Sequence, residues 1–169
     1  MMNRRALLTA GVALGALASM TKLSEAETMN TTEKTIDFKN LSDAEWHKRL
    51  NPEQYNVLRK AGTERAGTSL LNHEKRKGTF ACAGCDLPLF SSDTKFESGT
   101  GWPSFYQALA NAVDTKTDRS FFMSRTEVLC HRCDGHLGHV FDDGPKPTGL
   151  RYCMNGLALK FVPNGASSS

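Results

Sequence analysis

The sequence predicts a mainly β fold of the α+β class, in which short helices precede a series of short strands. Helix-capping patterns occur between residues 41 and 62, whereas beyond Gly67 the apolar runs are four to six residues long and most are bounded by Gly, Pro, Asp or Asn. The chain has 169 residues, 39% of them hydrophobic, which suffices for one core. We expect one ordered domain at residues 41–163, between a flexible lead at 27–40 and a flexible tail at 164–169.

The first 26 residues have the composition of a targeting segment. Arg4 and Arg5 precede an apolar run, residues 6–20, that is too short to span a bilayer easily, and small residues up to Ala26 offer a cleavage site. The double arginine resembles a twin-arginine signal, with a general secretory signal and an uncleaved anchor as alternatives. Either export route predicts a bacterial periplasmic protein with no membrane contact after signal removal.

The charge pattern gives no sign of a nucleic-acid partner. The formal net charge is +3, but the first 26 residues hold three bases and one acid, which leaves 18 basic and 17 acidic residues in the remainder. A nucleic-acid-binding domain is expected to carry a clear basic excess. We therefore expect no nucleic-acid partner.

Two short helices are predicted at the start of the ordered domain. Ser42 and Glu45 have the spacing of a capping box, which starts the first helix. Asn51 and Pro52 provide a cap and a first helical residue for the second, which we expect to stop at Gly62. The apolar side chains expected to pack on a sheet are Trp46, Leu50, Tyr55 and Leu58.

Strands are predicted over most of the remaining chain. The last candidate alternates, with Leu157, Leu159 and Phe161 on one face, as in a strand with one buried side. One short helix is expected at residues 105–112. The predicted strands are residues 79–83, 121–124, 127–130, 138–141, 150–154 and 157–162.

Four of the five cysteines form two CxxC pairs, Cys82 with Cys85 and Cys130 with Cys133, separated by 44 residues. Two such turns can complete the tetrahedral thiolate shell that zinc prefers, and four cysteine ligands leave no open position for water. The spacing favours one structural zinc ion, with two disulfides as the alternative in an oxidising compartment. The fifth cysteine, Cys153, remains as a candidate nucleophile.

The residues around Cys153 suit an activated thiol. In an extended chain, alternation places Arg151, Cys153 and Asn155 on one face. A neighbouring cation or imidazolium lowers the pKa of a thiol, so Arg151, His136 and His139 are candidate activators. A surface ion pair is the alternative role for Arg151.

Four short motifs follow one another along the chain: GTFACAGC at 78–85, SGTGWPSF at 98–105, HLGHVFDDGP at 136–145 and RYCMN at 151–155. Together they resemble the B-type methionine-R-sulfoxide reductases, over roughly residues 38–163. The resemblance implies two antiparallel sheets with N-terminal helices, a structural zinc ion, and reduction of the R epimer of methionine sulfoxide, mainly in proteins.

Sulfoxide reduction needs a nucleophile at sulfur and a proton for the departing oxygen. We expect Cys153 to attack and become a sulfenic acid, with His139 as the acid and His136 holding the oxygen or a water. The resemblance assigns Trp102 to the substrate methyl group, with core packing as the alternative, and Phe141 is expected to form another wall. A second metal site at the two histidines is disfavoured because no further ligand is evident.

One position departs from the family pattern. Many B-type enzymes have a resolving cysteine where this chain has Thr100, and the zinc ligands leave only Cys153. We therefore expect that an external thiol, such as a thioredoxin-like protein, restores Cys153. We also expect a monomer that acts on oxidised proteins. Gly156 also replaces a family serine. A zinc-ribbon binding module and a thiol–disulfide oxidoreductase are the alternatives outside this family.

Overall fold

The computed structural model describes residues 36–119 and 124–165. The predicted targeting segment, the first part of the predicted lead and all but one residue of the strand predicted at 121–124 lie outside the described residues. Within the described ranges, no helix has the length and apolar character needed to cross a membrane.

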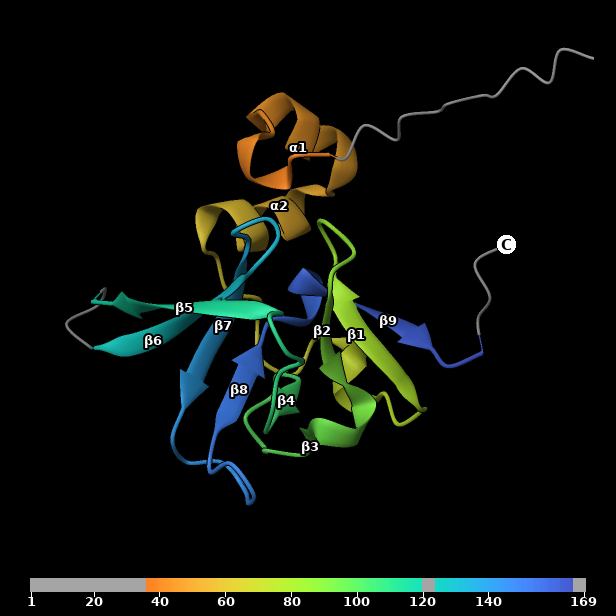
Figure 1. Cartoon of the computed structure of the whole chain (residues 1–169), viewed down its shortest axis with the longest axis vertical. Helices are drawn as coiled ribbons and strands as arrows, with labels where there is room; N and C mark the ends of the chain where they lie inside the picture. The colour runs from red at the N-terminus through yellow and green to blue at the C-terminus, as the bar shows by residue number, and fades with distance from the viewer. Residues whose placement is uncertain (1–35, 120–123, 166–169) are drawn as a thin grey trace, which may run out of the picture. The chain divides into compact units, whose positions relative to one another are not determined.

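Both predicted helices are present, and their N-terminal caps are those predicted (Figure 1). Helix α1, Asp43–Arg49, starts with the Ser42 hydroxyl accepting from the backbone N–H of Glu45. Helix α2, Pro52–Lys60, starts with Asn51 in a second capping box. The four predicted apolar side chains, Trp46, Leu50, Tyr55 and Leu58, are all buried.

The ends of the helical region differ in detail from the prediction. The left-handed residue that ends α2 is Ala61, with φ of 52°, rather than Gly62. Within the predicted flexible lead, Phe38–Asn40 forms a short 3-10 helix, η1, and the Phe38 ring lies 6.3 Å from that of Trp46. This contact ties the lead to α1.

The strands form two antiparallel sheets, which confirms the predicted mainly β class (Figure 1). The three-stranded sheet has the order β2-β1-β9, with bounds Pro88–Ser91, Gly78–Cys82 and Leu159–Pro163. The six-stranded sheet has the order β3-β4-β8-β7-β6-β5, with bounds Lys95–Phe96, Ser104–Phe105, Arg151–Met154, His136–Phe141, Arg125–Cys130 and Val113–Asp118.

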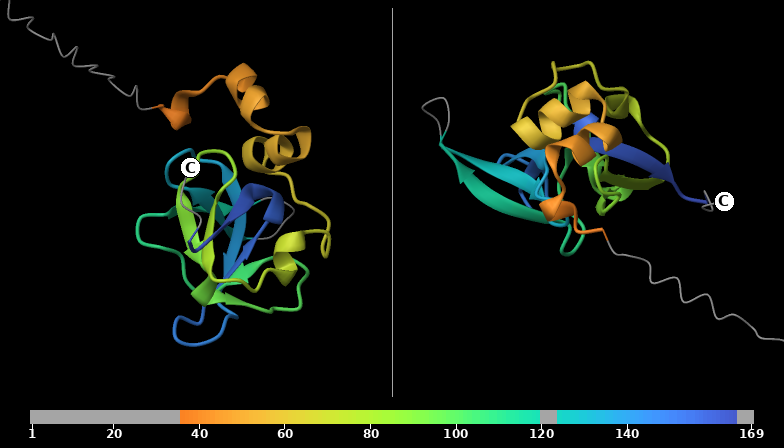
Figure 2. Two further views of the ribbon diagram at one scale, coloured as in Figure 1. Left: turned by 90° about the vertical axis from the view of Figure 1, so that its right-hand side faces the viewer. Right: turned by 90° about the horizontal axis from the view of Figure 1, so that it is seen from above.

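The main core lies between the two sheets. Phe80 and Phe90 belong to the small sheet, and their rings lie 4.9 and 4.4 Å from that of Phe105 in the large sheet. All three are fully buried, and the helices cover one end of the sheets (Figure 2). Stacked and edge-on aromatic rings at these distances pack favourably, so they hold the sheets together.

The prediction of a helix at residues 105–112 is wrong. Phe105 belongs to β4, where it pairs with Tyr152, and Leu109 donates its backbone N–H to Leu89 rather than to its own segment. Burying Phe105 between the sheets outweighs the local helical tendency, because tertiary packing overrides weak propensity.

The strands differ from the prediction at the start of the last strand, and β2, β3, β4 and β5 were not predicted. The last strand starts at Leu159, since Gly156–Ala158 forms a 3-10 helix, η5. Strand β5 was not predicted because its residues are mostly polar and give no apolar alternation. The remaining short 3-10 helices are η2, Leu70–His73, and η3, Ser92–Thr94.

Strands β7 and β8 approach closely at Gly138. Its φ is +157°, and a Cβ added there would lie 2.1 Å from the carbonyl oxygen of Cys153. A side chain at this position would therefore push apart the two strands that carry the histidines and the thiol.

We expect Gly138→Ala to lower the free energy of unfolding by more than about 3 kcal/mol, because it adds a backbone clash to an unfavourable φ. The matched control is Gly149→Ala, which also has a positive φ of 71° but meets no atom within 4 Å. That variant should cost only about 1–2 kcal/mol. Urea unfolding of both variants measures the difference, and equal losses would contradict the close approach.

Candidate active site and metal centre

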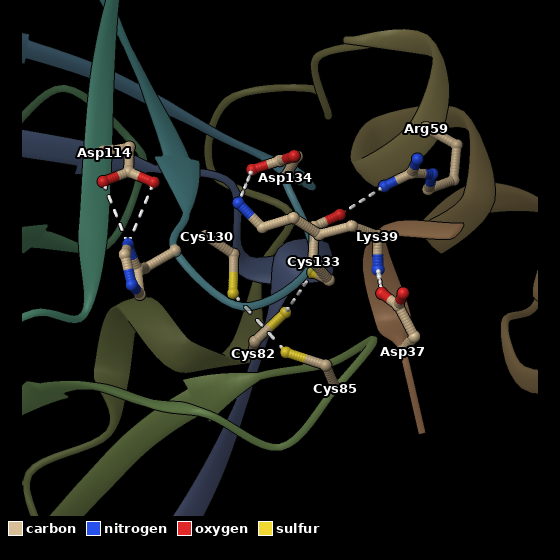
Figure 3. A network of polar contacts seen from close by, with 10 residues as sticks. Asp37, Lys39, Arg59, Cys82, Cys85, Asp114, Cys130, Cys133 and Asp134 are labelled. Carbon is tan, nitrogen blue, oxygen red and sulfur yellow. Dashed lines mark hydrogen bonds and ion pairs between the residues drawn. The ribbon is translucent and has the colours of Figure 1, made fainter. Parts of the chain in front are cut away.

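The four cysteines of the two CxxC pairs form one buried cluster (Figure 3). Their sulfur atoms all lie within 4.8 Å of one another, with 3.7 Å between Cys82 and Cys133 and 3.4 Å between Cys85 and Cys130. Four thiolates about 2.3 Å from a tetrahedral zinc ion would stand roughly 3.8 Å apart. The donor set and its spacing therefore fit a metal ion with four sulfur ligands.

The position of the cluster indicates a structural role. One CxxC pair begins at Cys82, the last residue of β1 in the small sheet, and the other begins at Cys130, the last residue of β6 in the large sheet. An ion there would therefore link the two sheets. Arg59 donates to the Cys133 carbonyl and Arg132 to the Cys85 carbonyl, each at 2.9 Å. A thiol–disulfide oxidoreductase would need one of these pairs free, which the shared buried cluster does not offer.

A separate small cavity surrounds Cys153. Its volume is about 130 Å³, and five of the predicted site residues line it, whereas Arg151, His136 and the four cluster cysteines do not. The lining residues are Thr63, Trp102, Arg125, Gly138, His139, Phe141, Cys153 and Asn155.

Cys153 is held between two strands of the large sheet. In the ladder it pairs with His139 of β7 and with Ser104 of β4. Burial raises the pKa of the Cys153 thiol, and the Thr100 hydroxyl and the Arg151 charge act in the opposite direction without offsetting it. The predicted activation by Arg151 thus has the expected sign, but the thiol stays protonated at neutral pH in the free protein.

Arg151 has both of the roles that the sequence left open. Its guanidinium makes two bonds of 2.8 Å to the Asp143 carboxylate and lies 4.4 Å from the centre of the Phe141 ring. The pKa of Arg151 is raised, first by Asp143 and in smaller part by Cys153. The ion pair therefore orients a charge that the thiol also senses.

The side chains of His136 and His139 lie close together although the two residues are three positions apart on one strand. Val128 pairs with Gly138 and Leu129 pairs with His136, so Leu137 is an extra residue in β7. Such a bulge shifts the alternation by one, and the ring centres of His136 and His139 consequently lie 5.5 Å apart.

Each histidine contacts a carboxylate that the sequence analysis did not identify. Nδ1 of His136 lies 2.7 Å from Glu127, and Nε2 of His139 lies 2.9 Å from Asp118, which also accepts from Arg125 at 2.8 Å. These partners are on β5 and β6, and no local motif marks them.

Burial and hydrogen bonds set the charges of His136 and its partner Glu127. Burial lowers the pKa of His136, with Glu127 acting against it. Burial also acts to raise the pKa of Glu127, but hydrogen bonds from His136 and Lys116 leave it lowered. The pair is therefore a neutral imidazole that donates from Nδ1 to an ionised carboxylate, which leaves Nε2 of His136 as an acceptor.

Glu64 is the main positioning residue that sequence reasoning missed. Its backbone N–H donates to the Asn155 side chain at 3.0 Å, and its carbonyl accepts from the Trp102 indole at 3.2 Å. Its buried carboxylate accepts from the backbone N–H groups of Gly156 and Leu157 at 2.6 and 3.0 Å. A single glutamate in a polar loop gives no signal of this role.

Hydrogen bonds fix the orientations of Asn155 and Trp102, the two predicted site residues that Glu64 contacts. Asn155 donates to the Leu137 carbonyl at 3.1 Å, so it joins the Glu64 loop to β7. Because the Trp102 N–H is used by Glu64, the ring lines the cavity with its apolar surface.

A chain of hydroxyl groups leads to the Cys153 thiol. It ends at Thr100, the position at which many B-type enzymes have a resolving cysteine. Thr100 Oγ1 lies 3.8 Å from Cys153 Sγ and 2.9 Å from Ser98, whose hydroxyl lies 2.7 Å from that of Ser104. The side chain at position 100 is therefore close enough to contact whatever forms on the sulfur.

Comparisons with known proteins agree with this geometry. A model of the SelR domain family matches residues 50–163. The chain is 59% identical to a peptide methionine sulfoxide reductase MsrB of Leptospira interrogans over 123 residues, 72% of this chain and 94% of the relative. It is 59% identical to the MsrB of Methanosarcina barkeri over 71% of this chain and 85% of the relative. It is 58% identical to the chloroplastic reductase B1 of Arabidopsis thaliana over 73% of this chain and 62% of the relative.

Among solved structures, the Mis18 Yippee-like domain matches 53% of this chain with a TM-score of 0.44 and 20% identity, which supports no functional conclusion. The family match spans both CxxC pairs, the histidines and Cys153. The chain therefore belongs to the SelR family, the B-type methionine sulfoxide reductases.

Proposed function

We propose that this protein reduces the R epimer of methionine sulfoxide, chiefly in polypeptides, through a one-cysteine cycle. The observation that carries the proposal is the 130 Å³ cavity in which the Cys153 thiol, the Trp102 ring and His139 face the same space. Membership of the family supports the reductase activity, and the names of its relatives specify peptide methionine sulfoxide.

The walls of the cavity support selection of one epimer. Sulfoxide sulfur is pyramidal, with a methyl group, a carbon chain and an oxygen pointing in three directions. If Trp102 receives the methyl group and His139 receives the oxygen, only one epimer presents its sulfur to Cys153. The family resemblance assigns that epimer as R.

In the first step the Cys153 thiol passes its proton to His139, which lies opposite it in the ladder, and the sulfur attacks the substrate sulfur as a thiolate. The S–O bond breaks, the oxygen takes a proton from His139 and passes to Cys153, and the products are a thioether and a sulfenic acid. Neutral His136 lies behind the cavity wall, and its Nε2 acts as an acceptor that holds a water beside His139. In the second step two equivalents of an outside thiol restore Cys153, giving one disulfide and one water.

We further propose that the metal ion is zinc. Cys82, Cys85, Cys130 and Cys133 would hold it as a closed shell of four sulfurs, so it would link the sheets and supply no reactive position.

Substituting Cys153 by serine should abolish sulfoxide reduction while leaving the fold intact. We expect wild type to reduce dabsyl-methionine R-sulfoxide and not the S-sulfoxide with dithiothreitol as reductant, and Cys153→Ser to lose at least about 10³-fold in kcat/KM, because a serine hydroxyl is a poor nucleophile. Metal analysis is the control and should find one zinc ion per chain in both proteins. Zinc-loaded wild type without turnover would refute the proposed reaction.

The one-cysteine cycle predicts the mass of the oxidised protein. After reaction with substrate in the absence of reductant, denatured wild type should gain one oxygen atom at Cys153. Thr100→Cys is the matched comparison, since position 100 lies beside the sulfur, and it should instead lose two hydrogen atoms in a disulfide. An internal disulfide that includes Cys153 in wild type would contradict the cycle.

The raised pKa of Cys153 predicts a pH dependence. A raised pKa means that the thiol is protonated below it, so alkylation of Cys153 by iodoacetamide should reach half its maximal rate above the ordinary cysteine value of about 8.5. Because Arg151 acts to lower this pKa, Arg151→Gln should move the midpoint further upward. Cys153→Ser provides the background rate, and a midpoint below pH 7 would be the contrary result.

A further inference from the structure

A second, larger cavity opens beside the Cys153 cavity. Its volume is about 820 Å³, and it is lined by α2, by the loop from Thr63 to Leu71 and by residues 156–159. We propose that this groove binds the polypeptide segment that flanks the oxidised methionine. The inference rests on the proposed function and names where the rest of its substrate lies.

The two cavities adjoin at the loop that follows α2. Thr63 lines both of them. The next residue, Glu64, bonds to Trp102 and Asn155 on the side of the small cavity and to the backbone of Gly156 and Leu157 on the side of the groove. A substrate chain whose oxidised methionine fills the small cavity therefore has the groove on the other side of Thr63 and Glu64.

The volumes of the cavities match the parts of the substrate. About 130 Å³ suffices for the methylsulfinyl end of one side chain but not for the peptide that carries it. The 820 Å³ groove falls in the range of about 300–1,000 Å³ that is typical of ligand-binding clefts. The backbone and neighbouring side chains of the substrate consequently have a place beside the thiol.

The lining of the groove favours an apolar flank. Leu70 is 88% exposed at the groove, compared with 38% for Leu109 and 40% for Val162 elsewhere on the described surface. Leu71 and Leu157 add apolar surface, while the carboxylate of Glu64 is already engaged by two backbone N–H groups. A leucine this exposed next to a reaction cavity suits contact with an apolar side chain of the substrate.

Two substrates distinguish the groove from the catalytic cavity. The small one is N-acetyl-methionine R-sulfoxide, and the large one is a nine-residue peptide with a central R-sulfoxide and leucines on both sides. Leu70→Ser should lower kcat/KM for the peptide about tenfold, as expected for losing the burial of an apolar side chain, and leave kcat/KM for the small substrate unchanged. Leu109→Ser, which removes an exposed leucine that lines neither cavity, should change neither.

The outcomes separate the two proposals. Failure of wild type to reduce the small substrate would reject the proposed reaction itself. Normal reduction of the small substrate, together with an equal effect of Leu70→Ser on both substrates or no effect on the peptide, would overturn the groove.

Binding can also be observed without turnover, by NMR on Cys153→Ser. The peptide should shift backbone amide signals of residues 52–57, 63–71 and 156–159, whereas the small substrate should shift signals around the small cavity alone. Peptide-induced shifts confined to the small cavity would likewise overturn the proposal.

Discussion

The antiparallel pairing of β7 with β8 is the constraint on which the site depends. It places His139 directly opposite Cys153, and it requires a glycine at position 138 because the Cys153 carbonyl oxygen occupies the space of a side chain. The extra residue Leu137 then turns His136 to the same side. One ladder thus brings a thiol and two imidazoles together without any of them lying on a mobile loop.

Burial keeps the Cys153 thiol and the His136 imidazole uncharged before substrate arrives. Burial raises the pKa of Cys153 and lowers that of His136, while Glu127 and Asp118 orient the imidazoles. A substrate that fills the cavity would exclude water and strengthen the interaction of Arg151 with a developing thiolate. The site is therefore better suited to a thiolate formed on substrate binding than to one present in the free protein.

Sequence reasoning identified most of the cavity and missed its supports. Trp102, His139 and Cys153 line one space, as the motifs indicated. Glu64 and Glu127 were missed, because their partners are recognised only when distant segments meet: Glu64 and Asn155 are 91 positions apart. The export signal stays a prediction, since residues 1–35 lie outside the described part of the chain.

The sequence by itself determined the features that depend on neighbouring residues. The caps at Ser42 and Asn51 start both helices, and the CxxC spacing predicts the two cysteine pairs of the metal site. Both features form between residues only two or three positions apart. Only the tertiary structure decided the secondary structure of residues 105–112, because burial of Phe105 between the sheets favours a strand there over the predicted helix. It also decided the charge state of the site, since burial and long-range partners, rather than residue type, set the pKa values there.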